Sequence, residues 1–287
     1  MRSISLLVNP AAGRFRADLT SAVEERLRDH GCAVRRLTTA TADEAARLAH
    51  DVRQDDVLAV AGGDGTVHCV LPAVAETTTA LGLIPAGSGN DLATSLGIPS
   101  DPLAAADLIA TGAVRQIDLA QAGRRWWATV LGAGFDSAVA ARANRMRWPA
   151  GPRRYDVAVL AELAQLRPYA FSLTRDGHAA QVDAILVAAG NTPIYGGGLQ
   201  ICPKAVLDDG LLDVTVVGPV SRHELLRVFP RLRTGNHLDH PAVSHFRVRE
   251  LSLDAPGVTA YADGEPVGAL PLTVTCRPRA LSVIAQL

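Results

Sequence analysis

The fold of this chain is decided by one stretch, Val57-Leu58-Ala59-Val60-Ala61-Gly62-Gly63-Asp64-Gly65-Thr66. Val57–Val60 is a short apolar run, as expected of a buried strand, and a glycine-rich segment with one aspartate follows it. Glycine lets bare backbone amides approach an anion closely, and a helix beginning beyond Thr66 would add its positive dipole. The stretch therefore predicts a phosphate-binding turn between a strand and a helix. Asp64 would repel a phosphate unless a magnesium ion lay between them.

Two further glycine-bearing segments follow predicted strands. Asn9-Pro10-Ala11-Ala12-Gly13 follows Ser3–Val8, and Pro85-Ala86-Gly87-Ser88-Gly89-Asn90-Asp91 follows Leu81–Ile84. Any one such segment reads equally well as a tight turn, but three at successive strand ends indicate one anion site. The hydroxyl of Ser88, like that of Thr66, can either cap a helix or bind a phosphate oxygen.

The first half of the chain alternates strands with helices. Strands are also predicted over Ala33–Leu37, and helices over Ala17–Arg28, Asp43–Val52, from Asn90, and over Leu103–Ala110. Strands that alternate with helices predict a parallel sheet with helices on its faces.

The second half has a different pattern. Short runs rich in β-branched residues are separated by turn signals such as Asp209-Gly210, Pro256-Gly257 and Asp263-Gly264. The predicted strands are Val182–Ala189, Leu211–Val217, Arg247–Leu253, Val258–Tyr261, Leu272–Cys276 and Leu281–Ala285. This pattern predicts an antiparallel β-sandwich. We place an α/β domain at 1–125 and a β-rich domain at 126–276, and leave open whether 277–287 returns to the first domain.

Composition limits the possible partners and compartment. The chain has 287 residues, 48% of them hydrophobic, and a net charge of −1, so it has no general attraction for nucleic acid. No apolar segment is long enough to span a bilayer, and Met1 is followed by a strand-like run rather than a leader. Four scattered cysteines are typical of reduced thiols. We expect a cytoplasmic protein.

The motifs carry a resemblance to a known family. Neither GxxxxGK[ST] nor a helix-opening GxGxxG is present, which argues against P-loop and Rossmann proteins. Gly62–Thr66 resembles the nucleotide motif of diacylglycerol and sphingosine kinases and, more distantly, of NAD kinases and phosphofructokinases. The similarity continues through Pro85–Ala93, Gly134-Phe135-Asp136-Ser137, Gly196-Gly197-Gly198, Pro203-Lys204-Ala205, Asp208-Asp209-Gly210-Leu211 and Asp263-Gly264-Glu265. Ser88, Ala12 and Thr129 depart from the family pattern, Thr129 where asparagine is usual.

The resemblance implies a fold and a reaction. It implies an α/β nucleotide-binding domain like that of phosphofructokinases and NAD kinases, followed by an antiparallel β-sandwich domain. The implied reaction transfers the γ-phosphate of ATP, with Mg²⁺, to a hydroxyl of a membrane lipid, with diacylglycerol as first choice and phosphatidic acid as product. The implied nucleotide-binding residues are Asn9, Pro10, Ala11, Ala12, Gly13, Thr38, Gly62, Gly63, Asp64, Gly65, Thr66, Val67, His68, Gly87, Ser88, Asn90 and Asp91. We take Thr38 over Thr39, although the local match can slide by one residue.

The resemblance also assigns roles to carboxylates. Asp64, Asp91 and Asp118 would form a water-linked network around magnesium, with Asp64 counted among the catalytic residues. Asp209, with the carbonyls of Val206 and Leu211, would hold a structural magnesium ion, whereas Asp209-Gly210 alone reads as a hairpin turn.

The Asp263-Gly264-Glu265 match implies the general base. Glu265 is our first choice as proton acceptor and Asp263 the second, while the plain alternative is a turn between two strands.

A basic segment predicts how the protein meets lipid. Arg142–Arg154 contains five arginines with Met146 and Trp148 among them, which suits an anionic membrane surface, although a solvated loop is the alternative. Trp126 and Trp127 are expected in the core. We therefore expect peripheral contact at the inner face of the membrane and leave a homodimer open. The competing hypotheses are an NAD kinase-like or sugar kinase and a catalytically silent lipid-binding module.

Overall fold

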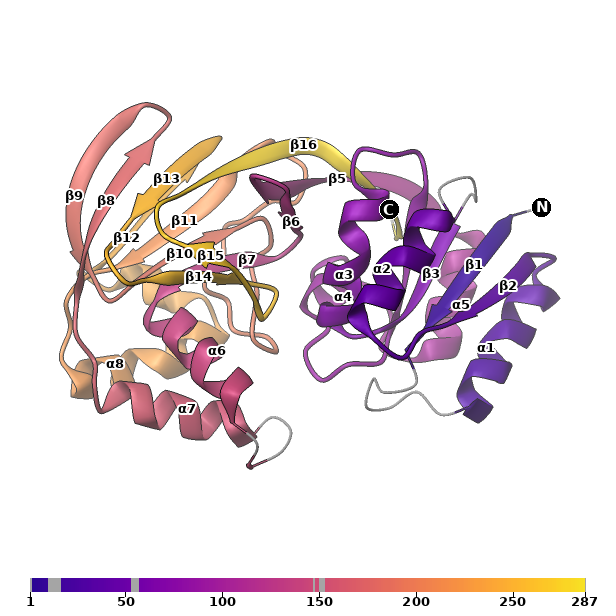
Figure 1. Ribbon diagram of the computed structural model, residues 1–287, viewed down its shortest axis with the longest axis horizontal. Helices are drawn as coiled ribbons and strands as arrows, with labels where there is room; N and C mark the ends of the chain where they lie inside the picture. The colour runs from indigo at the N-terminus through magenta and orange to yellow at the C-terminus, as the bar shows by residue number, and fades with distance from the viewer. Residues whose placement is uncertain (1, 10–16, 53–56, 147, 150–152, 287) are drawn as a thin grey trace. The chain divides into compact units, whose positions relative to one another are not determined.

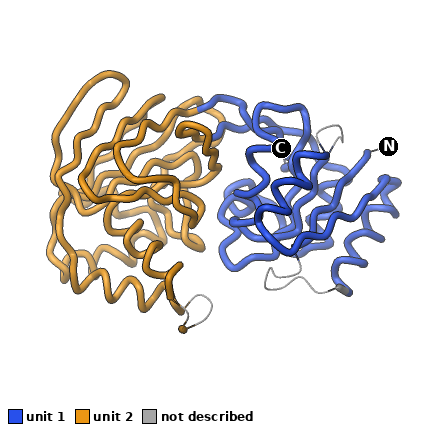
Figure 2. Tube along the Cα trace, viewed as in Figure 1, with its two compact units in different colours: residues 1–119, 277–287 blue, residues 120–276 orange. Residues whose placement is uncertain are grey.

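The computed structural model describes residues 2–9, 17–52, 57–146, 148–149 and 153–286. The chain divides into two compact units, residues 1–119 with 277–287, and residues 120–276 (Figure 2). Two long strands, β5 (Ala113–Ala122) and β16 (Leu272–Ala285), contribute residues to both units. Within the described part of the chain, no helix has the length and apolar character needed to cross a membrane.

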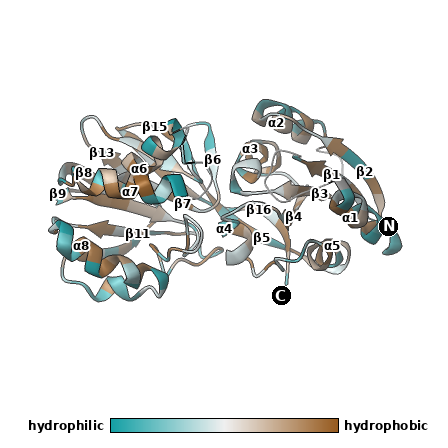
Figure 3. Cartoon of the chain, turned by 90° about the horizontal axis from the view of Figure 1, so that it is seen from below, coloured by the Kyte–Doolittle hydropathy of each residue, from teal (hydrophilic) through white to brown (hydrophobic). Residues whose placement is uncertain are grey.

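The first unit is built on a parallel sheet in the order β2-β1-β3-β4. Its strands are β1 (Ser3–Val8), β2 (Ala33–Thr38), β3 (Val57–Gly62) and β4 (Ala80–Pro85). Its helices are α1 (Ala17–Asp29), α2 (Ala42–Asp51), α3 (Asp64–Val74), α4 (Asp91–Ser95) and α5 (Pro102–Thr111). Helices α2 and α3 pack together on one side of the sheet, and α1 and α5 on the other (Figure 3). Every residue of β3 is buried, as the apolar run predicts.

The second unit is a sandwich of antiparallel strands. One layer has the order β12-β11-β10-β7-β14-β15, and the other contains β13, β8, β9 and the first part of β16. The bounds are β6 (Arg125–Trp127), β7 (Val130–Gly134), β8 (Tyr169–Arg175), β9 (His178–Ala184), β10 (Leu186–Gly190), β11 (Leu212–Val217), β12 (Val243–Val248), β13 (Glu250–Asp254), β14 (Thr259–Ala262) and β15 (Glu265–Ala269). Leu131, Val187 and Val214 from one layer pack with Phe171 and Leu251 from the other in the apolar core.

Three helices lie on the outer face of the six-stranded layer of this unit (Figure 1). They are α6 (Phe135–Arg145), α7 (Arg153–Leu163) and α8 (Arg222–Val228), and two 3₁₀ turns follow at Phe229–Arg233 and Asn236–Asp239. Phe135 of α6 and Leu225 of α8 pack on the sheet, whereas α7 packs on α6 through Ala158. The fold is thus the α/β domain and antiparallel sandwich that the sequence predicts.

Several predicted strands have other boundaries. Val182–Ala189 is the end of β9 and the start of β10, and Arg247–Leu253 is likewise divided between β12 and β13, which lie in different layers. Leu272–Cys276 and Leu281–Ala285 are instead parts of the single strand β16. Local apolar pattern does not reveal the layer to which a strand belongs, because both layers face the same core.

The helix expected beyond Thr66 begins two residues earlier, at Asp64. The carbonyl of Gly63 accepts hydrogen bonds from the amides of Thr66 at 2.9 Å and Val67 at 3.1 Å, so the glycine segment itself opens the helix. Thr66 therefore lies inside the first turn and does not cap the helix. Trp126 and Trp127 are buried, as expected.

Candidate functional site

The two glycine segments that follow β3 and β4 touch each other. The amide of Ala86 donates to the carbonyl of Gly62 at 3.0 Å. A Cβ atom built on Gly87 would lie 2.5 Å from the Cα of Gly63, and one built on Gly63 would lie 2.9 Å from the Cα of Gly87. No side chain fits between these backbones, so both positions require glycine. The contact leaves a pair of bare backbones at the carboxyl ends of adjacent parallel strands, where ligands of such sheets bind.

The side chain of Asn90 shapes the second segment. Its Oδ1 accepts a hydrogen bond from the amide of Gly87 at 2.9 Å, and its Nδ2 donates to the carbonyl of Gly87 at 3.0 Å. Asn90 itself has a left-handed backbone, with φ of 56°, and immediately precedes α4. Asn90, one of the predicted nucleotide residues, therefore uses its side chain to hold the backbone of the turn at Gly87 in one conformation.

Two predicted carboxylates lie around a third glycine. A Cβ atom built on Gly89 would lie 2.7 Å from Oδ2 of Asp64 and 3.5 Å from Oδ2 of Asp91. Asp91 is buried, and Oδ1 of Asp64 lies 3.5 Å from the amide of Leu92. Two carboxylates directed at one point supply the hard oxygen donors that Mg²⁺ prefers. The residues present therefore fit a magnesium ion bound with a nucleotide.

The remaining predicted residues of this unit are placed as follows. A small hollow is lined by Gly62, Gly63, Asp64, Val67 and Asn90, among others. Gly65 and Ser88 are exposed, Thr66 is buried against Gly62, His68 is half-buried on α3, and the amide of Asn9 donates to the carbonyl of Ala61 at 3.4 Å. Pro10, Ala11, Ala12 and Gly13 lie outside the described residues.

The two threonines at the end of β2, Thr38 and Thr39, differ in their exposure to solvent. Thr39 is buried, and its hydroxyl donates to the carbonyl of Thr41 at 2.7 Å. Thr38, at the end of β2, is exposed. Thr38 is thus the threonine that a ligand can reach without breaking an internal hydrogen bond.

In the second unit, the turn between β14 and β15 is held on two sides. Oδ1 of Asp263 accepts hydrogen bonds from the amide of Thr129 at 3.2 Å and from the Thr129 hydroxyl, and Oδ2 accepts one from the amide of Ala128 at 3.4 Å. The carbonyl of Gly264 accepts from Nδ2 of Asn144 on α6 at 3.0 Å. Glu265 opens β15 and is exposed. Asp263 therefore anchors the turn, and Glu265 is the more exposed carboxylate of the two.

Local sequence patterns do not identify the partners of this turn. Thr129 stands out only as a departure from the family pattern, although its hydroxyl donates to Asp263, 134 positions away in sequence. Nothing in the local sequence around Asn144 marks it as a partner of Gly264.

A further carboxylate, Asp136, lies at the start of α6. Its Oδ1 accepts a hydrogen bond from the amide of Ser137 at 2.8 Å, and its Oδ2 packs so closely on Gly132 of β7 that a Cβ has no room there. Burial raises the pKa of Asp136 to about 7. A carboxyl group with such a pKa changes its charge near neutral pH. Asp136 belongs to the Gly134–Ser137 motif, but the sequence predicted no site role for it.

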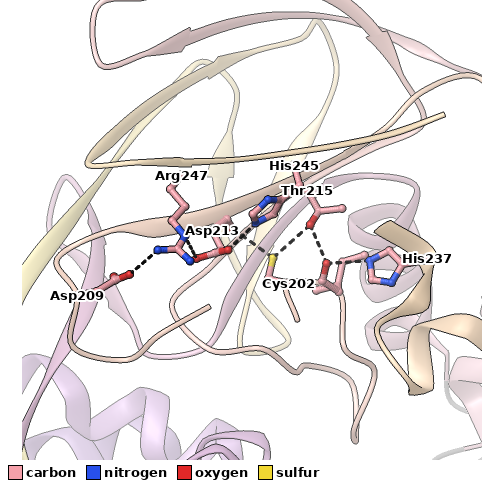
Figure 4. A network of polar contacts seen from close by, with 8 residues as sticks. Cys202, Asp209, Asp213, Thr215, His237, His245 and Arg247 are labelled. Atoms are coloured by element: carbon pink, nitrogen blue, oxygen red, sulfur yellow. Dashed lines mark hydrogen bonds and ion pairs between the residues drawn. The ribbon is translucent and has the colours of Figure 1, made fainter. Parts of the chain in front are cut away.

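The residues predicted to hold a structural metal have other contacts. Oδ1 of Asp209 accepts a hydrogen bond from the amide of Leu211 at 3.0 Å, and its Oδ2 lies 3.3 Å from a guanidinium nitrogen of Arg247 (Figure 4). Val206 is partly exposed. No cluster of three or more histidine, cysteine, aspartate or glutamate side chains suited to a metal occurs among the residues that the structure describes.

Asp118 is fully buried in the first unit, on β5. Its Oδ1 accepts a hydrogen bond from the amide of Arg279 at 2.8 Å, where the backbone of β16 has a positive φ of 55°. Asp118 therefore fixes an irregular position in β16.

Comparisons with known proteins agree with the fold and the motifs. Residues 3–122 match the diacylglycerol kinase catalytic domain, and residues 129–285 match the YegS C-terminal NAD kinase beta sandwich-like domain. The chain is 41% identical to a diacylglycerol kinase of Mycobacterium tuberculosis, over 98% of this chain and 94% of that protein. It is 32% identical to a probable lipid kinase YegS-like protein of Stenotrophomonas maltophilia, over 78% of this chain and 76% of the relative.

A solved structure shows the same fold. The crystal structure of a putative diacylglycerol kinase from Bacillus anthracis str. Sterne matches with a TM-score of 0.83, at 22% identity, over 99% of this chain and 97% of that one. With both domains matched and close relatives aligned along nearly their whole length, this chain belongs to the diacylglycerol kinase family of lipid kinases.

Proposed function

We propose that this lipid kinase transfers the γ-phosphate of ATP to the free hydroxyl of diacylglycerol, giving phosphatidic acid. The observation that carries the proposal is the contact of the two glycine segments, with Asp64 and Asp91 directed at Gly89 beside it. Diacylglycerol is chosen because relatives aligned along nearly the whole chain are named for it.

The proposed phosphate site lies in the first unit. Backbone amides at Gly63 and Gly89 are open to an incoming anion because these residues have no Cβ atoms, whereas the amide of Gly87 already donates to Asn90. Helix α3 begins at Asp64 with its positive end toward this point. Asp64 and Asp91 would hold Mg²⁺, which when bound offsets the charge of the phosphates. Exposed Thr38 is available to the nucleotide. In this proposal Asp118 is linked to Asp64 and Asp91 only through bound water molecules.

The proposed base lies in the second unit. Glu265 takes the proton of the lipid hydroxyl as the oxygen forms its bond to the γ-phosphorus, while the bond from that phosphorus to the β-phosphate oxygen breaks and ADP leaves. Asp263, held by Thr129 and Ala128, keeps the turn that carries Glu265 in one conformation. Positioning of this kind contributes to the rate because the base must lie within hydrogen-bonding reach of the hydroxyl.

We also propose that Trp148, together with the exposed face of α7, contacts the anionic inner face of the membrane; residues 147 and 150–152 of the predicted basic segment lie outside the described residues. Trp148 is 83% exposed and Leu160 is 64% exposed, with Arg145 and Arg153 exposed nearby in sequence. Apolar side chains flanked by arginine suit the lipid interface. Arg142 is excluded from this role because its Nε lies 2.5 Å from Oε1 of Glu162 within the unit.

The test of the reaction is transfer of label from γ-labelled ATP with Mg²⁺ to diacylglycerol in mixed micelles. Asp64→Asn and Glu265→Gln should each lower kcat by about 10²-fold or more. The matched controls are Asp51→Asn, at the exposed end of α2, and Glu250→Gln, exposed on β13, and both should retain activity. Transfer to NAD or a sugar instead would overturn the lipid assignment, and lipid binding without any transfer would favour a silent module.

The membrane proposal has a separate test. Trp148→Ala and Leu160→Ser should weaken co-sedimentation with phosphatidylglycerol vesicles, and the wild type should bind phosphatidylcholine vesicles less well. Leu226→Ser is the matched control, because Leu226 is a 52%-exposed leucine on a different helix, α8. Equal loss of binding in the control and the two variants would contradict the assignment to this face.

A further inference from the structure

A chain of charged side chains joins the Asp208–Leu211 turn to β11 and β12 (Figure 4). Oδ2 of Asp209 lies 3.3 Å from one guanidinium nitrogen of Arg247, and Nε of the same arginine lies 3.6 Å from Oδ2 of Asp213. Oδ1 of Asp213 lies 2.5 Å from Nε2 of His245. Asp213 and Arg247 are direct partners in the β11–β12 register. One arginine thus bridges two carboxylates that belong to different segments.

The bridge has a clear electrostatic reason. Asp213 is fully buried, and a buried carboxylate is strongly disfavoured unless it is paired. Burial raises the pKa of Asp213, while the hydrogen bond and charge of His245, together with the charge of Arg247, act in the opposite direction. Arg247 is partly exposed and supplies a positive charge that does not depend on pH in the physiological range.

These contacts do not suit the metal that the family resemblance places at Asp209. Both carboxylate oxygens already have partners, Oδ1 the amide of Leu211 and Oδ2 the guanidinium of Arg247. A divalent cation at Asp209 would have to displace the guanidinium of Arg247 from Oδ2 or bind beside it, and like charges a few ångströms apart repel each other. The turn also has the Asp-Gly composition that closes without any ion.

We propose that Arg247 acts in this chain in place of a divalent cation. It neutralises Asp209 and Asp213 together and ties the Asp208–Leu211 turn to β12, so that the second unit is stable without a metal ion at Asp209. The proposal concerns folding stability, so it stands or falls independently of the proposed lipid kinase reaction.

The first experiment is thermal unfolding of the full chain without nucleotide, in EDTA and in MgCl₂ at matched ionic strength, because salt itself screens ion pairs. Mg²⁺ should shift the Tm of the wild type and of Asp209→Asn by the same amount, because the magnesium site proposed at Asp64 and Asp91 is present in both proteins. Arg247→Gln should lower the Tm in EDTA by about 5 °C or more, and Mg²⁺ should recover part of that loss by binding the vacated carboxylates. Arg249→Gln, an exposed arginine two residues away, is the matched control and should change neither value.

The second experiment measures binding of Mn²⁺ by electron paramagnetic resonance to the wild type and to Asp209→Asn. It needs no Arg247 variant and therefore decides the matter even if Arg247→Gln does not fold. Equal binding is expected, because the site at Asp64 and Asp91 is the same in both proteins. The proposal is overturned if Asp209→Asn loses a Mn²⁺ site or if Mg²⁺ raises the wild-type Tm more than it raises the Tm of Asp209→Asn. It is also overturned if a folded Arg247→Gln is as stable as the control or gains no more Tm from Mg²⁺ than the control does.

Discussion

Replacing Gly87 by alanine should separate the two glycine segments on which the phosphate site depends. The added Cβ would lie 2.5 Å from the Cα of Gly63, whereas carbon atoms pack at about 3.5–4.0 Å. The backbones must therefore move apart by roughly 1 Å, since neither is a flexible side chain. Overpacking of this kind costs about 1–3 kcal/mol of unfolding free energy. A misplacement of about 1 Å at a catalytic site lowers the rate by about 100-fold.

The assay compares Gly87→Ala with Gly65→Ala. Gly65 is exposed in the first turn of α3, and a Cβ there meets no atom within 4 Å. Alanine in place of glycine inside a helix is expected to stabilise by about 0.5–1 kcal/mol. Differential scanning calorimetry should therefore show a lower Tm for Gly87→Ala and an unchanged or higher Tm for Gly65→Ala, on the order of 2–4 °C per kcal/mol. ATP titrations should show kcat/KM reduced by about 100-fold in Gly87→Ala.

One result would refute this reasoning. If Gly87→Ala melts at the wild-type temperature and keeps its kcat/KM for ATP, the segments after β3 and β4 are not in contact in solution. The assignment of bare backbone at Gly63 and Gly87 to phosphate binding would then have no basis.

Three other predictions follow from contacts of the second unit. Thr129→Val removes the hydroxyl that donates to Asp263, so it should lower the free energy of unfolding by about 1–3 kcal/mol and also lower kcat. Thr129→Ser keeps the hydroxyl and should restore the unfolding free energy and kcat. Equal stability of the two variants would contradict this role of the hydroxyl. Because the folded-state pKa of Asp136 is raised to about 7, the stability that this group contributes is full below about pH 4 and is lost as the pH rises through 7. Between pH 5 and pH 8 the free energy of unfolding of Asp136→Asn should therefore fall by about 2–3 kcal/mol less than that of the wild type in urea unfolding, and identical pH profiles would refute the shift. Burial raises the pKa of the Cys202 thiol to about 12, so iodoacetamide should modify half-buried Cys69 in the native protein well before Cys202. Peptide mass mapping that finds Cys202 modified first would contradict the burial of Cys202.

Much of the fold could be predicted because it depends on local patterns. The apolar run before Gly62 and the amphipathic stretch over Ala17–Arg28 have periodicities that identify a strand and a helix without knowledge of the rest of the chain. The elements that were missed, such as β7 and α6, have mixed patterns in which small residues replace large apolar ones.

The candidate site could be predicted only in part. Asp64 and Asp91 both lie around Gly89, since residues after adjacent parallel strands lie at the same edge of a sheet, and their shared role with Asp118 stays a prediction. The sequence could not separate the roles of Asp263 and Glu265, because that distinction depends on Thr129, which is distant in the chain. Likewise, the resemblance suggested a metal at Asp209, whereas the structure pairs that residue with an arginine 38 positions away.

The sequence by itself determined the class of each domain, the position of the glycine segments and the family, because these follow from residue types and spacings within short stretches. Only the tertiary structure decided which carboxylate anchors a turn, which is exposed and which is neutralised by arginine. Those properties depend on the partner that each group meets, and the partners of Asp263 and Asp209 come from strands and loops far away in sequence. The energy of a charged group is set by its surroundings after folding, and no local pattern records those surroundings.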